Sequence, residues 1–129
     1  MHTPGAYQLQ AAISALHAEA ATPNETDWEQ IAALYGKLAE LTPSPVVEVN
    51  RAVAVAMAHS PVAGLNLLAR IEGLANFYPY HAARADLLRR LNRRAEAAAA
   101  YELALALCPN PAESAHLQRR RDEMVARKP

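Results

Sequence analysis

The run over residues 44–57, S-P-V-V-E-V-N-R-A-V-A-V-A-M, constrains the fold most because it is almost wholly apolar. Ser44 is a good N-cap and Pro45 suits the first helical position, so a helix begins here. A helix that is apolar around most of its circumference must be covered on several sides. We therefore expect it to lie in the middle of a helical stack. Three polar residues interrupt the run: Glu48, Asn50 and Arg51.

Six further helical segments surround this run, and no strand pattern is present. Asp27, Ser60 and Asn110 are expected N-caps, and Gln30 and Glu113 stand where a capping box places its acid or amide. The expected helices are 7–21, 28 to the T-P-S-P turn at 42–45, 45–57, 61 to Gly73, about 78 to Asn92, 95–107 and 111–127. The last has a thin apolar stripe, as a lid would: Ala115, Leu117, Met124 and Val125.

The third expected helix pair carries the marks of a tetratricopeptide repeat. These marks are small or aromatic residues at fixed spacing, closed by a proline: Ala85, Ala97, Tyr101, Ala104 and Pro109. A shift of two periods of about 33 residues brings Ile31, Tyr35 and Pro43 onto Ala97, Tyr101 and Pro109. One period places Arg51 over Arg84.

This register predicts an all-α fold, a tetratricopeptide-like solenoid of three helix pairs plus a C-terminal capping helix. Each pair buries part of its surface and needs its neighbour, so three pairs are near the minimum for stability. We expect a single domain over residues 1–129, with repeats at roughly 5–43, 44–77 and 78–110 and a cap at 111–127. An unrelated helical bundle with accidental spacing remains the alternative.

Composition limits the function classes. The chain has 13 basic and 13 acidic residues, which argues against binding nucleic acid through net charge. Through residue 77 there are three Lys or Arg against seven Asp or Glu, and from residue 78 onward ten against six. A single cysteine, Cys108, excludes an internal disulfide and fits a cytoplasmic protein. No stretch approaches a membrane span.

Five segments in order resemble a known family: G-A-Y-Q-L-Q-A-A-I-S-A-L-H-A, D-W-E-Q-I, S-P-V-V-E-V-N-R-A-V-A-V, Y-H-A-A-R-A-D-L-L-R-R-L and A-Y-E-L-A-L. Together they are similar to the C-terminal tetratricopeptide-like extension of a subgroup of bacterial extracytoplasmic-function RNA polymerase sigma factors. The chain departs mildly from that pattern at Ala6, Asn92 and His116. The modules of a sigma factor that read and melt the promoter have no counterpart here.

The resemblance implies a regulatory or protein-interaction role in transcription initiation. The expected partners are RNA polymerase or the N-terminal sigma modules of the same protein, and no sequence-specific DNA binding is expected from these residues alone. The alternative is a free-standing tetratricopeptide adaptor that binds a peptide in its groove. We expect no enzyme, no cofactor and no metal site, because no catalytic constellation or ligand spacing is present.

The polar residues of the first helices of repeats are the candidate site. Arg51 and Arg84 replace a leucine of the generic pattern, so each must be paired or reach water. One hypothesis is an internal polar ladder with Glu48, Asn50 and Asp86. The other is a groove whose guanidinium groups take a partner's carboxylates. The candidate partner-binding residues are Asn50, Arg51, His81, Arg84, Arg89 and Arg90.

Overall fold

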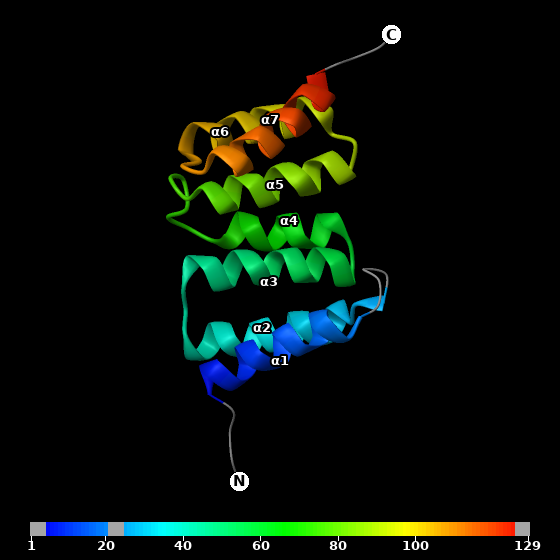
Figure 1. Ribbon diagram of the computed structural model, residues 1–129, viewed down its shortest axis with the longest axis vertical. Coiled ribbons are helices and arrows are strands. Elements are labelled where there is room, and N and C mark those ends of the chain that lie inside the picture. The colour runs from blue at the N-terminus through cyan, green and yellow to red at the C-terminus, as the bar shows by residue number, and fades with distance from the viewer. Residues whose placement is uncertain (1–4, 21–24, 126–129) are drawn as a thin grey trace. The chain divides into compact units, whose positions relative to one another are not determined.

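The computed structural model of the chain describes residues 5–20 and 25–125. These residues form seven α-helices and no strand, which confirms the all-α class (Figure 1). The helix ends expected at Ala21 and at Arg127 lie outside the described residues. The helices are α1 (Ala6–Glu19), α2 (Trp28–Leu41), α3 (Pro45–Ala58), α4 (Pro61–Arg70), α5 (Tyr78–Arg90), α6 (Arg94–Leu107) and α7 (Pro111–Val125).

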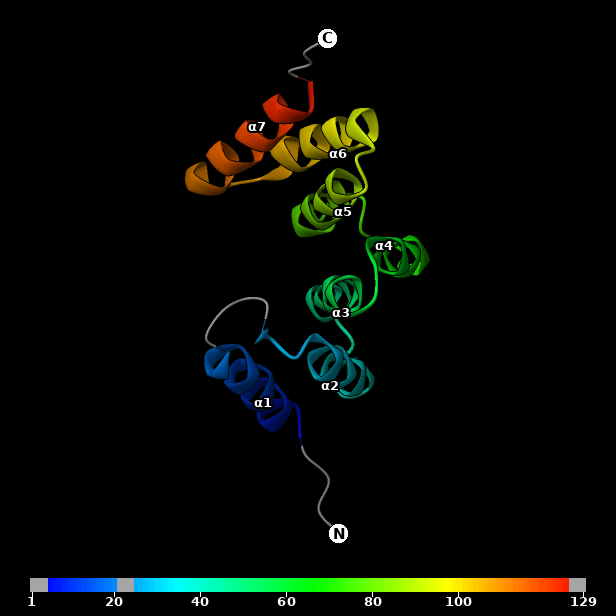
Figure 2. The ribbon, with the colours of Figure 1, turned by 90° about the vertical axis from the view of Figure 1, so that its right-hand side faces the viewer.

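The helices divide between two compact units, a first unit of Met1–Gly64 and a second unit of Leu65–Pro129. In the first unit α1 packs on α2 and α2 packs on α3; in the second, α5 packs on α6 and α6 on α7 (Figure 2). Packing between neighbours in sequence is what a helical repeat requires. The boundary falls inside α4, and the single domain over residues 1–129 stays a prediction.

Side-chain caps begin the helices where the sequence predicts them. The Ser44 hydroxyl accepts from the Val47 amide at 3.2 Å, and the Ser60 hydroxyl accepts from the Ala63 amide at 3.1 Å. Each serine is followed by a proline at the first helical position. The Asp27 carboxylate accepts from the Gln30 amide at 3.1 Å. Each bond satisfies a backbone donor that the first helical turn leaves unpaired.

A left-handed residue ends α5. Asn92 has a φ of 61°, and its amide donates to the Arg89 carbonyl at 2.9 Å. The next amide, of Arg93, donates to the Leu88 carbonyl at 3.0 Å. These two bonds form a Schellman motif, which asparagine supports because its side chain tolerates the left-handed region. The motif explains why the turn into α6 is tight.

The α3 helix is buried on two faces, because its buried positions fall into two sets with helical spacing. Val47 and Ala54, two helical turns apart, belong to the core that α1 and α2 share. Ile31 and Leu38 of α2 are buried in the same core. The second set is spaced by three and four residues: Val49, Ala52 and Ala56. Most of the apolar surface of α3 is thus buried, although Val46 is 54% exposed.

The α7 helix is attached by an apolar stripe thinner than predicted, because Ala115 and Val125 of the expected four residues are exposed. Leu117 and Met124 are buried in the core of the second unit, whereas Val125 is 55% exposed. The Asn110 side chain caps the helix by accepting from the Ala112 amide at 2.8 Å and the Glu113 amide at 3.2 Å. The Glu113 side chain does not complete a capping box. It accepts instead from the Tyr78 hydroxyl at 3.0 Å, which ties the start of α7 to the start of α5.

This tie predicts a pH dependence. Burial and the neighbouring Glu113 carboxylate raise the pKa of Tyr78 to about 12. An unfolded phenol titrates near 10, so this contact stabilises the fold below pH ~10 and its contribution is lost as pH rises toward 12. Glu113→Gln is expected to shift the highest tyrosine titration, followed by absorbance, to lower pH. Tyr78→Phe should remove that component, and superimposable curves for Glu113→Gln and wild type would contradict the assignment.

None of the helices in the part of the chain that the structure describes is long and apolar enough to cross a membrane.

Candidate functional site

An open depression lies between α2 and α3 in the first unit. We call it the α2–α3 depression, and its lining residues are Ala32, Ala33, Gly36, Lys37, Ala39 and Glu40 from α2 and Arg51 from α3. Arg51 is exposed, and its Nε would lie 3.6 Å from a β-carbon added at Gly36. The guanidinium therefore lies against α2 at its smallest residue. Arg51 reaches water and does not occupy a leucine-like core position.

Asn50 and Arg51 do not form the predicted ladder. The Asn50 side chain hydrogen-bonds Tyr35 of α2; burial raises the pKa of the Tyr35 phenol, and this bond acts in the opposite direction. Among the described residues, no ion pair joins Arg51 to Glu48. Asn50 thus ties α3 to α2, while Arg51 is left on the wall of the depression.

In the second unit, Asp86 pairs with the arginines that follow it. Its two oxygens accept from Arg89 at 2.6 Å and from Arg90 at 2.9 Å, over three and four residues of α5. The hypothesis that Asp86 pairs with Arg84 is therefore wrong, because the carboxylate faces the next helical turn. Arg84 is half-buried and close to Glu96.

Glu96 is held mainly by a different arginine. Its oxygen Oε1 accepts from Arg93 Nε at 2.7 Å. This hydrogen bond lowers the pKa of Glu96, and the charge of Arg84 acts in the same direction. Arg84 consequently contributes electrostatically to the start of α6 without a direct ion pair in the described residues.

Arg89 interacts with residues of both α5 and α6, so its guanidinium is engaged within this helix pair. Its side chain is 24% exposed, and it interacts with the Tyr101 hydroxyl on α6 as well as with Asp86. The Asp86 carboxylate raises the pKa of the Arg89 guanidinium, and burial raises that of the Tyr101 phenol. These contacts give Arg89 a structural use that a surface arginine would not have.

His81 is a packed residue. It is 7% exposed, and its Nε2 lies 2.8 Å from the Ala75 carbonyl, which requires the proton on Nε2. The ring also meets Tyr80 edge-on, with centroids 5.0 Å apart. His81 was a candidate partner-binding residue, but its burial places it away from a partner's reach.

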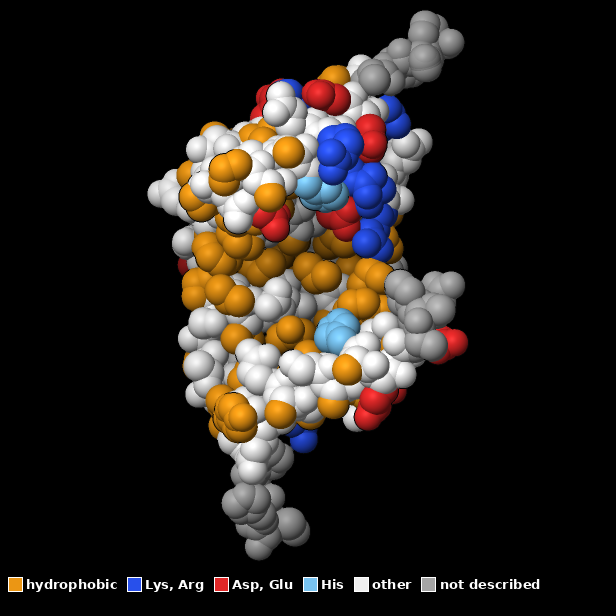
Figure 3. Space-filling model, in the orientation of Figure 1, with side chains coloured by type: hydrophobic (Ala, Val, Ile, Leu, Met, Phe, Trp, Pro, Cys, Tyr) orange, Lys and Arg blue, Asp and Glu red, His pale blue; other side chains and the backbone are white. Residues whose placement is uncertain are grey.

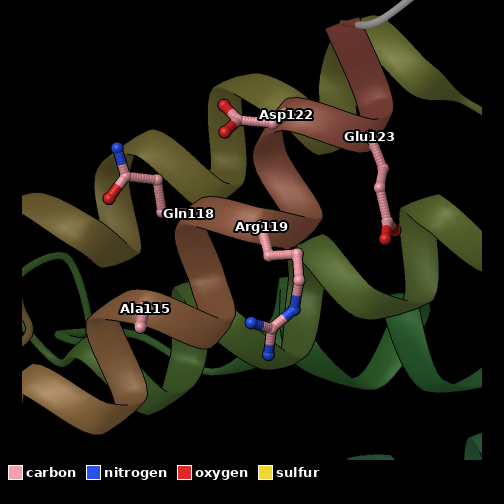
Figure 4. Close-up of a pocket in the computed structure, with 5 residues that line it drawn as sticks. All are labelled: Ala115, Gln118, Arg119, Asp122 and Glu123. Atoms are coloured by element: carbon pink, nitrogen blue, oxygen red, sulfur yellow. The ribbon is translucent and has the colours of Figure 1, made fainter.

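A second open depression lies along α7. All its lining residues come from that one helix: Ala115, Gln118, Arg119, Asp122 and Glu123. Gln118 and Asp122 point to one side of α7 and Arg119 to another, so the feature is an exposed strip (Figure 4). Arg120 pairs with Glu123 at 3.2 Å, and Arg121 with Asp122 at 3.0 Å. In the second unit basic and acidic side chains accordingly lie side by side (Figure 3).

Several arginines of the second unit pair with acidic side chains of the same unit: Arg89, Arg90, Arg93, Arg120 and Arg121. Arg121 also reaches Glu102 of α6 at 3.4 Å, and Arg94 donates to the Glu123 carbonyl in the last part of α7. Exposed pairs of this kind contribute little to stability one by one. They also reduce the positive field that an acidic partner would meet. The pairs thus weaken, without removing, the basic excess of the chain from residue 78 onward.

The described residues contain no group of three or more His, Cys, Asp or Glu side chains placed to hold a metal ion. Cys108 is partly buried against the core of the second unit, with Sγ 3.6 Å from the Asn110 carbonyl. Its position at the end of α6 agrees with a small filling residue.

Lys37 and Glu40 are site residues that sequence reasoning missed. They stand on the exposed face of α2, where charged residues are ordinary. Their relation to Arg51 depends on the register between two helices joined by a turn. One feature of the sequence could have indicated them: residues 1–64 contain only two Lys or Arg residues, Lys37 and Arg51.

Comparison with known proteins gives one extensive similarity. The chain is 46% identical over 124 residues to "Uncharacterized protein R00370" of Rhizobium meliloti (strain 1021). The aligned region covers 95% of this chain and 29% of that relative, so the chain spans less than a third of the relative's length. No protein-family model matches the chain.

Proposed function

We propose that this chain is a regulatory, protein-interaction module of an extracytoplasmic-function sigma factor, working in the cytoplasm during transcription initiation. The observation that carries the proposal is the ordered resemblance of five segments. They fall on α1, the start of α2, α3, α5 and α6, so the resemblance follows the helical framework rather than a loop. The proposed partners are RNA polymerase and the promoter-reading sigma modules, with no catalytic role for this module.

The length of the relative supports this proposal. In that protein the matched region is 29% of the chain, so the same helical module belongs to a longer polypeptide there. A regulatory extension requires such a context. A free-standing peptide adaptor is the second candidate, and the open α2–α3 depression favours it because the site needs no other module to form.

Binding to the transcription machinery tests the proposal. The immobilised chain is expected to retain core RNA polymerase, or separately expressed sigma modules encoded by the same gene. Tyr101→Ala, which weakens the fold, should lower that retention if a folded surface is responsible. In gel shifts at two salt concentrations the chain should not distinguish promoter from scrambled DNA, because its net charge is zero.

Two outcomes would contradict the proposal. Tight binding that discriminates a promoter sequence would make the chain a DNA reader. A gene without sigma modules, together with no retention of polymerase, would leave the peptide adaptor as the function.

A further inference from the structure

The positive charges of the first unit converge on one place. Residues 1–64 contain two Lys or Arg and six Asp or Glu. Both cations, Lys37 of α2 and Arg51 of α3, line the α2–α3 depression. Glu40 also lines this depression, so its lining carries two positive charges against one negative charge. The convergence of the two cations creates a local positive site on a surface that otherwise repels anions.

The surroundings of Arg51 leave its hydrogen-bond donors available. Among the described residues it has no ion pair, although Glu48 stands one helical turn before it. Its Nε would lie 3.6 Å from a β-carbon added at Gly36, an ordinary van der Waals distance, so the side chain lies along the surface of α2. A guanidinium held against a helix loses less freedom on binding a carboxylate than an extended one.

The rest of the depression is small and apolar. Ala32, Ala33 and Ala39 line it beside Gly36, so another backbone can come close to α2. Glu40 is the one acidic residue of the lining. A second carboxylate on a ligand would be repelled by Glu40 and by the net negative first unit. Such repulsion selects among anionic partners as effectively as attraction does.

We propose that the α2–α3 depression docks a protein segment that presents one carboxylate among small apolar residues. The carboxylate binds Arg51 and Lys37, and the small side chains of the segment lie on Ala32, Gly36 and Ala39. The proposal rests on the proposed interaction function and specifies the chemistry of its partner. Nucleic acid is disfavoured here because a polyanion would meet six acidic residues for two basic ones.

A pair of peptides tests this chemistry on the whole chain. The first is an alanine-rich helical peptide with one central glutamate and blocked ends, and the second has glutamine in its place. Titration is followed by nuclear magnetic resonance at the Gly36 amide and the Arg51 Nε–H. The glutamate peptide is expected to shift both signals saturably. The glutamine peptide should bind about fivefold more weakly, because an exposed ion pair contributes up to about 1 kcal/mol.

Variants of the chain divide the contributions. Arg51→Gln should weaken binding of the glutamate peptide by the same factor. Lys37→Gln should weaken it by about twofold, because an exposed lysine contributes little to an ion pair. Glu40→Gln should strengthen it, because a repulsive charge is removed. Arg70→Gln is the matched control, since it removes an exposed arginine outside the depression and should leave binding unchanged.

A charge exchange completes the test. The Arg51→Glu variant should no longer bind the glutamate peptide. It should bind a peptide with lysine at the central position more tightly than the wild-type chain does. Equal binding of the glutamate and glutamine peptides, or indifference to both Arg51→Gln and Lys37→Gln, would overturn the proposal. If Arg51→Gln still retained polymerase or sigma modules as wild type does, this docking site would be wrong while the interaction function stood.

Discussion

Tyr101→Ala is expected to lower the free energy of unfolding by about 3–5 kcal/mol, the cost of deleting a buried aromatic side chain. Tyr101 is 2% exposed in the core of the second unit, between Ala97 and Ala104 of its own helix, which are fully buried. Alanines cannot move in to fill the space that the ring leaves. The change also removes the hydroxyl that interacts with Arg89, whose Nε is already buried without a partner among the described residues.

Urea unfolding measures this loss as a shift of the midpoint at unchanged slope. Arg121→Ala is the control, because the acidic partners of its ion pairs are 60% and 62% exposed, and it should change stability by less than about 0.5 kcal/mol. Trp28→Ala should fall between the two. Trp28 is partly buried, against the core of the first unit and edge-on to His17. Equal, small shifts for all three would mean that the repeat register is wrong.

Leu117→Ala is expected to cost about 2–5 kcal/mol and to loosen α7 first. Leu117 is 3% exposed and, with Met124, makes up the buried stripe by which this helix joins the core of the second unit. With so few apolar anchors, one deletion removes a large part of the attachment. The remaining contacts of α7, such as Tyr78 with Glu113 and Arg121 with Glu102, are polar and exposed.

The adjacent residue on the same helix is the matched control. Gln118 is exposed, so Gln118→Ala should change stability by no more than about 0.5 kcal/mol. Hydrogen exchange should show faster exchange of α7 amides in Leu117→Ala than in Gln118→Ala, before α5 and α6 are affected. If the two variants unfold at the same midpoint, α7 is held by its polar contacts and the lid interpretation is wrong.

Peptide binding and stability measured together distinguish a structural role of Arg51 from a docking role. A structural Arg51 would change the midpoint when replaced, whereas a docking Arg51 would change peptide affinity at unchanged midpoint. Its exposure predicts the second result. For Arg89 the reverse holds, because Asp86 and Tyr101 engage it inside the helix pair.

The helices themselves follow from the sequence alone. Ser44, Ser60 and Asn110 each accept a backbone amide within three residues and are followed by proline, so their effect depends on no distant partner. The left-handed turn at Asn92 and the thin stripe of α7 likewise follow from local chemistry and periodicity. Residues close in sequence meet in any fold that keeps the helix.

The Asp86 pairs with Arg89 and Arg90 also follow from helical spacing, because they join residues three and four apart on α5. Tertiary structure decided the contacts of polar residues between helices. Glu113 looked like a local capping residue, yet it accepts from Tyr78, 35 residues away in sequence. Arg51 matched a core position of the repeat, but which face of a helix is covered depends on its neighbours, and here that face is open beside Gly36 and Lys37. Which partner a long side chain reaches on another helix depends on how the two helices pack, and the sequence of one helix does not determine that.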